Sequence, residues 1–202
     1  MGSEIHNRSV EFFEAQFQRQ VRERDYALNP FETLALDYLV GTVLDLGSGL
    51  GNLSLEAGRR GYRVIAVDAS PAAVARINTD AQRERLPVHA IQADVEKWSI
   101  DQPYDTIVAI GLLMFFCRER ALDLLCAIQQ HVNPGGRAVV NVLIEGTTYM
   151  GMFEQDNYYL FQRNELEERF AGWNILSSRH DTFPAPEGTR KEFSTVIAEK
   201  PT

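Results

Sequence analysis

The sequence contains little cysteine, few histidines and no long apolar run. Its two cysteines, Cys117 and Cys126, stand in no C-x-x-C or other metal-ligand spacing, so neither a disulfide framework nor a metal site is expected. No segment approaches the roughly 18 consecutive apolar residues of a membrane-spanning helix. The polar residues 1–7 contain no apolar signal-peptide core. These absences favour a protein of the reducing cytoplasm that does not span a membrane.

Basic residues are also few relative to acidic ones. With 20 lysines and arginines against 28 acidic residues, the net charge is -8, which opposes a nucleic acid or an anionic membrane as partner. The hydrophobic share of 45% is ordinary for a globular protein. A length of 202 residues predicts one domain, 1–202, with room for a full core. We expect a monomer or a homodimer that acts on a small molecule.

One glycine-rich stretch organises the rest of the chain. Residues 43–51 read Val-Leu-Asp-Leu-Gly-Ser-Gly-Leu-Gly, which predicts a buried strand, a sharp turn and the start of a helix. This geometry brings bare backbone close to a nucleotide. The spacing is G-x-G-x-G, whereas a dinucleotide fingerprint would need its third glycine at Asn52. The candidate ligand-binding residues of this stretch are Asp45, Gly47, Ser48 and Gly49.

Strands and helices alternate after this turn. Five strands are expected at 42–46, 62–67, 87–92, 104–110 and 137–144, with helices at 50–60, 71–85 and 118–132. Such alternation predicts a parallel sheet with helices on both faces. The class is therefore α/β.

The carboxyl ends of the expected strands carry the next candidates. Asp68 ends the second strand about twenty residues after the glycine turn, where a carboxylate can accept both hydroxyls of a ribose. Asp94 follows the third strand, where it could accept the amino group of a purine base, although it could instead cap a turn. Ala69 and Val95 could sandwich the ring of such a base, and Ile110 ends the fourth strand at the same edge of the sheet.

The two flanks of this region are less regular. Two helices, 9–24 and 31–39, precede the first strand and either pack against the sheet or form a lid. After a loop at 146–160 and a short helix at 162–170, two strands are expected at 173–179 and 191–199. The loop between them, 181–190, contains two prolines and a glycine, and the pair is expected to be an antiparallel hairpin.

The motif Asp-x-Gly-x-Gly-x-Gly at 45–51 resembles motif I of the class I S-adenosylmethionine (SAM) methyltransferases. This resemblance implies a Rossmann-like fold with a mostly parallel seven-stranded sheet, an antiparallel last strand and SAM as cofactor. Leu-Met-Phe at 113–115, Asn-Glu-Leu at 164–166 and Ala-Gly-Trp at 171–173 are similar to the tellurite-resistance methyltransferase (TehB) family. The TehB resemblance covers most of the chain.

The TehB resemblance implies a small acceptor, a chalcogen oxyanion such as tellurite or selenite, held by a histidine and nearby arginines. His180 matches that histidine, and Arg190 is the nearest basic residue to a second family arginine. Asp181 stands where the family has an arginine directly after the histidine. His180 and Arg190 are the expected catalytic residues, and the expected substrate contacts are Tyr26, Tyr149, Phe153 and Phe161.

The expected organisation is a helical cap at 1–40, a cofactor-binding half at 41–145 and a substrate-side segment at 146–202. Two alternatives remain open. A non-catalytic SAM-binding or regulatory protein would bind the cofactor without turnover. An NAD(P)-dependent oxidoreductase would explain the glycine turn and Asp68, but not the missing third glycine or the closing hairpin.

Overall fold

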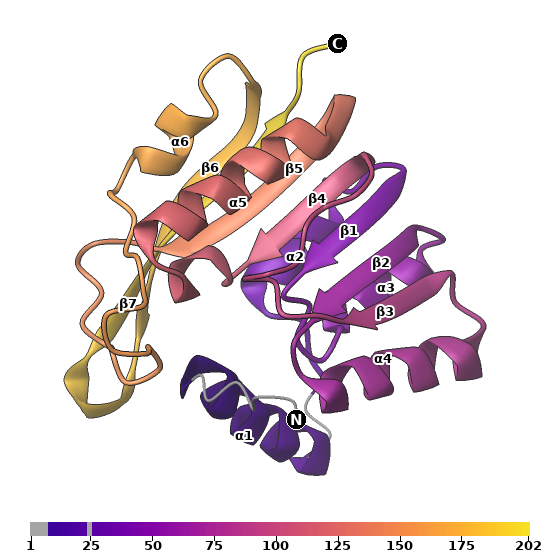
Figure 1. Ribbon diagram of the computed structural model, residues 1–202, viewed down its shortest axis with the longest axis horizontal. Helices are drawn as coiled ribbons and strands as arrows, with labels where there is room; N and C mark the ends of the chain where they lie inside the picture. Colours follow the sequence, from indigo (N-terminus) through magenta and orange to yellow (C-terminus); the bar gives the residue numbers. More distant parts are fainter. Residues whose placement is uncertain (1–7, 24–25) are drawn as a thin grey trace.

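The computed structural model describes residues 8–23 and 26–202, and its centre is one seven-stranded sheet (Figure 1). The strand order is β3-β2-β1-β4-β5-β7-β6, and β7 alone runs antiparallel to its neighbours β5 and β6. The strands are β1 Thr42–Leu46, β2 Arg63–Asp68, β3 Val88–Gln92, β4 Tyr104–Ile110, β5 Val132–Leu143, β6 Asn174–Pro184 and β7 Arg190–Glu199. This is the mostly parallel, Rossmann-like sheet that the resemblance implied.

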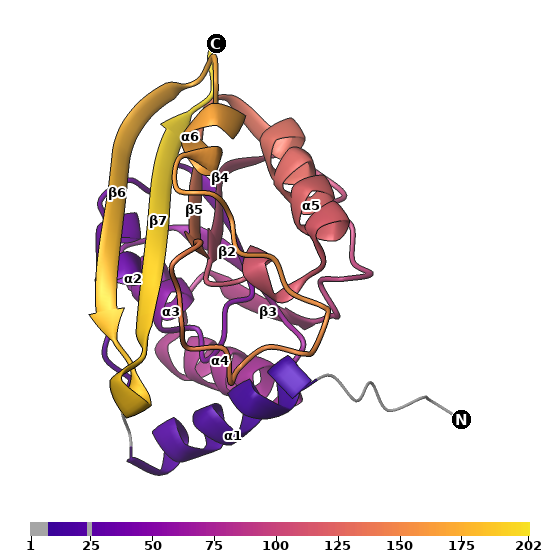
Figure 2. The same cartoon turned by 90° about the vertical axis from the view of Figure 1, so that its left-hand side faces the viewer.

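Helices cover both faces of the sheet (Figures 1 and 2). One apolar cluster joins α2, α3 and α4 to one face, and a second joins α5 and α6 to the other. The helices are α1 Arg8–Glu23, α2 Pro30–Leu36, α3 Asn52–Arg59, α4 Pro71–Glu84, α5 Arg118–His131 and α6 Glu165–Arg169. Short 3-10 turns occur at Leu113–Phe115 and Pro186–Gly188.

The alternation of side chains along β1 connects the two faces to the site. Leu44 and Leu46 join the cluster on the α5 face, whereas Val43 joins the cluster on the α3 face. Because successive residues of a strand point to opposite faces, Asp45 is directed to the α3 side, where Ser54 donates a hydrogen bond to it. The sheet thus buries a carboxylate next to the glycine turn.

The N-terminal helix α1 lies across the carboxyl ends of the parallel strands, next to the tip of the β6–β7 hairpin (Figures 1 and 2). The expected end of this helix, Arg24, lies outside the described residues. The next helix, α2, begins with a capping box in which Asn29 accepts hydrogen bonds from Phe31 and Glu32, and Glu32 accepts one from Asn29. The two helices bring aromatic and polar side chains to the same edge of the sheet.

The closing hairpin differs from its expected form. The expected loop at 181–190 is wrong, because β6 and β7 stay paired as far as Pro184 and Arg190 and leave only a short connection. Pro184 is tolerated there because it ends β6, which is the edge strand of the described sheet. As a result, His180 and Arg190 lie in strands and are not part of a loop over the sheet.

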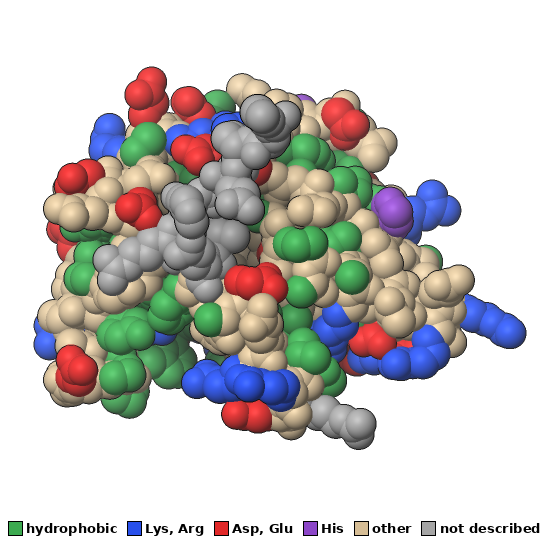
Figure 3. All heavy atoms as spheres, turned by 60° about the horizontal axis from the view of Figure 1, so that its bottom comes forward, with side chains coloured by type: hydrophobic (Ala, Val, Ile, Leu, Met, Phe, Trp, Pro, Cys, Tyr) green, Lys and Arg blue, Asp and Glu red, His purple; other side chains and the backbone are tan. Residues whose placement is uncertain are grey.

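Within the described residues, no helix is both long and apolar enough to cross a membrane. Acidic and basic side chains are interspersed with hydrophobic ones on the face shown in Figure 3. The part of the chain that the structure describes also brings no three histidine, cysteine or carboxylate side chains together as a metal site.

A candidate cofactor and acceptor site at the carboxyl edge of the sheet

A cavity of about 470 Å³ lies at the carboxyl edge of the sheet, between the strand ends and helices α1 and α2. Its volume falls in the range of about 300–1,000 Å³ that is usual for small-molecule sites. Its wall includes all nine residues for which a cofactor contact was predicted: Asp45, Gly47, Ser48, Gly49, Asp68, Ala69, Asp94, Val95 and Ile110.

The glycine turn lies against the end of β2. The N–H groups of Gly47 and Ser48 both donate to the carbonyl of Val67, at 2.8 and 3.1 Å. Gly47 and Gly49 have positive φ angles of 66° and 52°, which a residue with a side chain adopts only with strain. A Cβ at Gly47 would lie 2.9 Å from Cδ1 of Leu112. The turn therefore requires glycine and presents bare backbone to the cavity.

Asp68, the last residue of β2, links the end of that strand to the glycine turn through hydrogen bonds. One carboxylate oxygen accepts the N–H of Gly49 at 2.7 Å, and the other accepts the N–H of Ser70 at 2.8 Å. Burial raises the pKa of Asp68, although these backbone hydrogen bonds oppose the rise. Each carboxylate oxygen retains acceptor capacity, so this side chain can still receive two hydroxyl groups from a ligand.

A second acidic group faces the cavity beside it. Asp45 is almost completely buried and accepts a 2.6 Å hydrogen bond from the Ser54 hydroxyl. Burial is the main cause that raises the pKa of Asp45 to about 7; the hydrogen bond from Ser54 opposes the rise, and the negative charges of Glu32 and Asp68 add to it. Burial also raises the pKa of Glu32. This part of the cavity therefore favours a ligand that carries positive charge.

Several buried polar atoms of the wall have no hydrogen-bond partner in the described part of the chain. They include the hydroxyl of Ser48 and Oδ2 of Asp94, which lies 3.3 Å from Nζ of Lys97 without a well-directed hydrogen bond. Oδ1 of Asp94 accepts the N–H of Glu96, so Asp94 also fixes the turn after β3. Buried atoms without a hydrogen bond, a bare glycine turn and a strand-end carboxylate fit a nucleoside with hydroxyl and amino groups.

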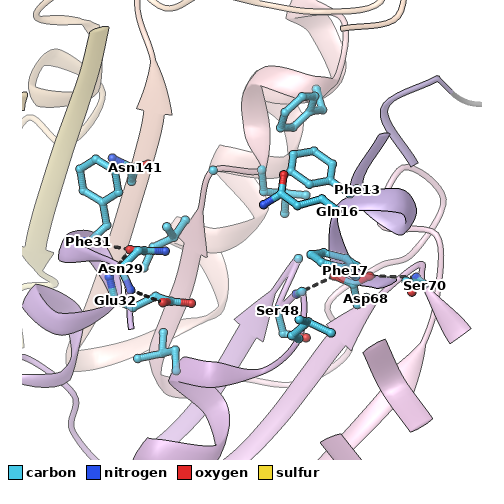
Figure 4. Close-up of a pocket in the computed structure, with 18 of the residues that line it drawn as sticks. Phe13, Gln16, Phe17, Asn29, Phe31, Glu32, Ser48, Asp68, Ser70 and Asn141 are labelled. Atoms are coloured by element: carbon cyan, nitrogen blue, oxygen red, sulfur yellow. Dashed lines mark hydrogen bonds between the residues drawn. The ribbon is translucent and has the colours of Figure 1, made fainter. Parts of the chain in front are cut away.

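Helix α1 covers the end of the cavity that the glycine turn and Asp68 form (Figure 4). The ring of Phe13 packs edge-on against Phe115 with centroids 5.0 Å apart, and a Cβ at Gly49 would lie 3.2 Å from Phe17. Glu14 accepts a 2.5 Å hydrogen bond from the hydroxyl of Ser70. These contacts place α1 as a cover over the turn, which is one of the two roles considered for it.

The opposite end of the cavity is formed by α2, β5 and β7. Phe31, Asn141, Lys191 and Phe193 line it, and Figure 4 shows Phe31 beside Asn141. None of these four residues was predicted from the sequence. Asn141 does leave a signal there, because it is the one polar residue within the apolar run 138–144. Phe31, Lys191 and Phe193 line the cavity because α2 and β7, which are distant in the sequence, pack near one another. No local sequence pattern shows that packing.

Comparison with known proteins identifies the chain. The family described as "Tellurite resistance protein TehB" matches residues 25–183. The chain belongs to the TehB family. It is 28% identical over 164 residues to the probable SAM-dependent methyltransferase TehB of Haemophilus influenzae strain 10810, covering 78% of this chain and 57% of that protein.

Two further relatives define the extent of the likeness. A protein of Eikenella corrodens named Hemagglutinin 1 is 31% identical over 164 residues, covering 78% of this chain and 54% of that protein. The crystal structure of TehB from Haemophilus influenzae superposes with a TM-score of 0.76 at 24% identity, covering 90% of this chain and 65% of that one. The chain thus spans little more than half the length of the two sequence relatives.

The acceptor-side residues expected from the TehB resemblance do not line the cavity. His180 lies on β6, and its Nε2 is 2.7 Å from the carbonyl oxygen of Arg163. Arg190 is exposed at the start of β7 and pairs with Glu192 at 2.9 Å. The structure therefore places both side chains away from the site that holds the cofactor candidates.

The expected substrate contacts lie behind or beside the wall. Phe153 packs on Phe115, and the ring of Tyr149 lies 4.9 Å from Nζ of Lys191, so each contacts a residue that lines the cavity. Phe161 is fully buried in the core. The ring of Tyr26 lies 3.8 Å from the guanidinium carbon of Arg76, outside the cavity. None of these four side chains forms part of the cavity wall.

Proposed function

We propose that this TehB-family protein is a SAM-dependent methyltransferase that acts on a small molecule. The observation that carries the proposal is that the glycine turn, Asp68 and the buried Asp45 line the same cavity. A nucleoside cofactor with a cationic end matches these groups in order along the sheet edge. The family match supports the same reading.

The residues would divide the cofactor between them. Asp68 would accept the ribose hydroxyls, Ala69 and Val95 would flank the adenine, and Asp94 would accept its amino group. Asp45 would face the cationic amino-acid end, close to the last residue of β4, Ile110. The open backbone of the glycine turn would allow the close approach that this arrangement needs.

The chemistry asks mainly for positioning. When bound, SAM supplies a methyl group on a positively charged sulfur, and transfer to a nucleophile leaves a neutral thioether. The chain would hold the acceptor in line, which is worth about 7–11 kcal/mol in well-oriented reactions. The aromatic side chains of α1 would exclude water from the site. A base is needed only for a nucleophile that arrives protonated.

For tellurite or selenite to be the methyl acceptor, cationic side chains would be needed at the acceptor end of the cavity. Among the described residues that line the cavity, Lys191 is the single lysine or arginine. For His180 and Arg190 to act on an acceptor, the β6–β7 hairpin would have to move, because neither lines the cavity. Both oxyanions therefore enter the test as two acceptors among several.

The test is transfer of a labelled methyl group from SAM to a panel of small acceptors, namely tellurite, selenite, thiols, phenols and halides. The proposal expects labelled product with at least one of them. Tight SAM binding with no transfer to any acceptor would support the non-catalytic alternative. Binding of NAD without binding of SAM would support an oxidoreductase and contradict the proposal.

A further inference from the structure

The acceptor end of the cavity lies well separated from the nucleoside end. Asp68 ends β2, whereas Lys191 and Phe193 lie on β7, four strands further along the sheet. Neighbouring strands are about 4.8 Å apart, so the two ends are separated by about 19 Å. In Figure 4, Asn29, Phe31, Glu32 and Asn141 form one group, and Ser48 and Asp68 belong to another. The cavity can therefore hold a cofactor at one group of side chains and a methyl acceptor at the other.

The floor of the acceptor end holds a buried amide with spare hydrogen-bonding capacity. Asn141 is fully buried, and its Nδ2 donates to the hydroxyl of Thr195 at 2.8 Å, while Oδ1 has no hydrogen-bond partner among residues 8–23 and 26–202. Turning the amide over would leave Nδ2 unpartnered instead, since Thr195 bonds only one of the two atoms. Asn141 pairs in register with Ile110, the last residue of β4. Asn141 therefore lies one strand away from Ile110, where the amino-acid end of the cofactor is expected.

The walls of the acceptor end are aromatic. The rings of Phe31 and Phe193 are 4.8 Å apart between centroids, and Phe183 packs on both at 5.7 and 5.8 Å. Phe31 and Phe193 line the cavity. Such walls favour a flat apolar body over a small, strongly hydrated ion, because they offer no hydrogen bonds to replace lost water.

The rim holds one positive charge. Lys191 is half-buried, and within the described residues its ammonium group forms no hydrogen bond or ion pair; its contact is with the face of the Tyr149 ring. Burial lowers the pKa of Lys191. Phe183 lies opposite Lys191 in the β6–β7 register, so the ammonium stands at the edge of the aromatic walls.

We propose that the methyl acceptor is a small organic molecule with a flat apolar body and one anionic group. Lys191 holds the anionic group, Phe31 and Phe193 contact the body, and Asn141 positions the reacting atom. The inference rests on the proposed function, because it assumes that the cofactor fills the nucleoside end. It favours an organic anion over an inorganic oxyanion, which would need paired guanidinium donors that the cavity wall lacks.

The test compares 4-mercaptobenzoate, its methyl ester and tellurite as acceptors, with turnover measured at saturating SAM. We expect turnover of the carboxylate at a KM at least tenfold below that of the ester, and little turnover of tellurite. Lys191→Gln should raise the KM for the carboxylate about tenfold, the usual size of one lost charged contact, and leave that for the ester within twofold. Calorimetry should show that 4-mercaptobenzoate binds about tenfold more weakly to the S-adenosylhomocysteine complex of Lys191→Gln than to that of the parent protein.

Matched variants separate this role from general damage. Arg179→Gln removes one positive charge from the exposed face of the neighbouring strand β6, outside the cavity, and should change neither KM. Asn141→Val should lower kcat with a smaller change in KM. If that buried variant does not fold, as a melting curve would show, Lys191→Gln alone decides the proposal.

Three outcomes would overturn the inference while leaving the proposed function intact. One is an equal KM for the carboxylate and the ester in both the parent and Lys191→Gln. Another is a loss of SAM affinity in Lys191→Gln with unchanged KM, which would assign the lysine to the cofactor. The third is efficient turnover of tellurite that depends on Arg190 and not on Lys191. Failure of the parent protein to bind SAM would instead contradict the proposed function itself.

Discussion

The two ends of the cavity are built in different ways. The proposed nucleoside end is lined by backbone turns and carboxylates drawn from 45–49, 68–70 and 94–95. The proposed acceptor end is lined by side chains from α2, β5 and β7, which come from positions as distant as Phe31 and Phe193. The first end depends on backbone conformation and the second on packing between distant elements. Substitutions at the two ends should therefore change different measured quantities.

The largest expected effect is at the glycine turn. Gly49→Val forces a branched side chain into a left-handed conformation and into the space between the turn and Phe17. We expect SAM affinity to fall at least a thousandfold, about 4 kcal/mol, as measured by calorimetry. Gly61→Val is the matched control, because Gly61 also has a positive φ but nothing within 4 Å of its added Cβ. It should lower stability and leave SAM affinity unchanged.

The buried acid of the nucleoside end should make stability depend on pH. The folded-state pKa of Asp45, about 7, lies above its ordinary value of 3.8, so the folded protein binds more protons than the unfolded chain between these values. Its contribution to stability is present below pH 4 and is lost as the pH rises through 7. The loss is on the order of 4 kcal/mol, because each pH unit between 3.8 and 7 contributes 1.36 kcal/mol.

Asp45→Asn tests this dependence, because the amide stays neutral and can still accept the hydrogen bond from Ser54. In urea unfolding without cofactor, the variant should be more stable than the parent at pH 8. In a separate binding measurement, it should bind SAM more weakly than the parent. The exposed Asp101→Asn serves as the control and should do neither. An identical pH dependence in parent and Asp45→Asn would show that Asp45 is not the group responsible.

Asp68→Ala should have the next largest effect on cofactor binding. It removes the expected ribose acceptor together with the hydrogen bonds to Gly49 and Ser70. We expect SAM affinity to fall by roughly 1.5–3 kcal/mol, the cost of lost hydrogen bonds to a charged group. Asp68→Asn retains one acceptor oxygen and should lose less. Parent-like affinity in Asp68→Ala would mean that the nucleoside does not bind at β2.

The smallest expected effect concerns the cover formed by α1. Phe17→Ala removes a ring that lies over the glycine turn, so SAM should dissociate about threefold to tenfold faster with little change in association rate. Val21→Ala alters an exposed apolar residue of the same helix and should leave both rates unchanged. Stopped-flow fluorescence with the two variants measures the rates. Equal dissociation rates in Phe17→Ala and the parent would remove α1 from the binding site.

The contrast between the ends also explains what the sequence could predict. The observed β1 and β4 cover the expected ranges, and the nine cofactor candidates share one cavity, because a strand, a glycine turn and a strand-end acid are local patterns. The predicted strands of the hairpin are too short, because two prolines and a glycine at 181–190 indicate a loop, whereas the pairing of the strands continues as far as Pro184 and Arg190. Lys191 and Phe31 meet the cavity only through tertiary packing, which no spacing in the sequence reveals.

The measurement that tests the central claim most directly is calorimetry of the purified chain with SAM, S-adenosylhomocysteine and NAD. The account predicts saturable one-to-one binding of the first two at micromolar affinity, loss of both in Gly49→Val, and no heat with NAD. Binding of NAD at micromolar affinity, with no heat from SAM or S-adenosylhomocysteine, would contradict the claim that this cavity holds SAM.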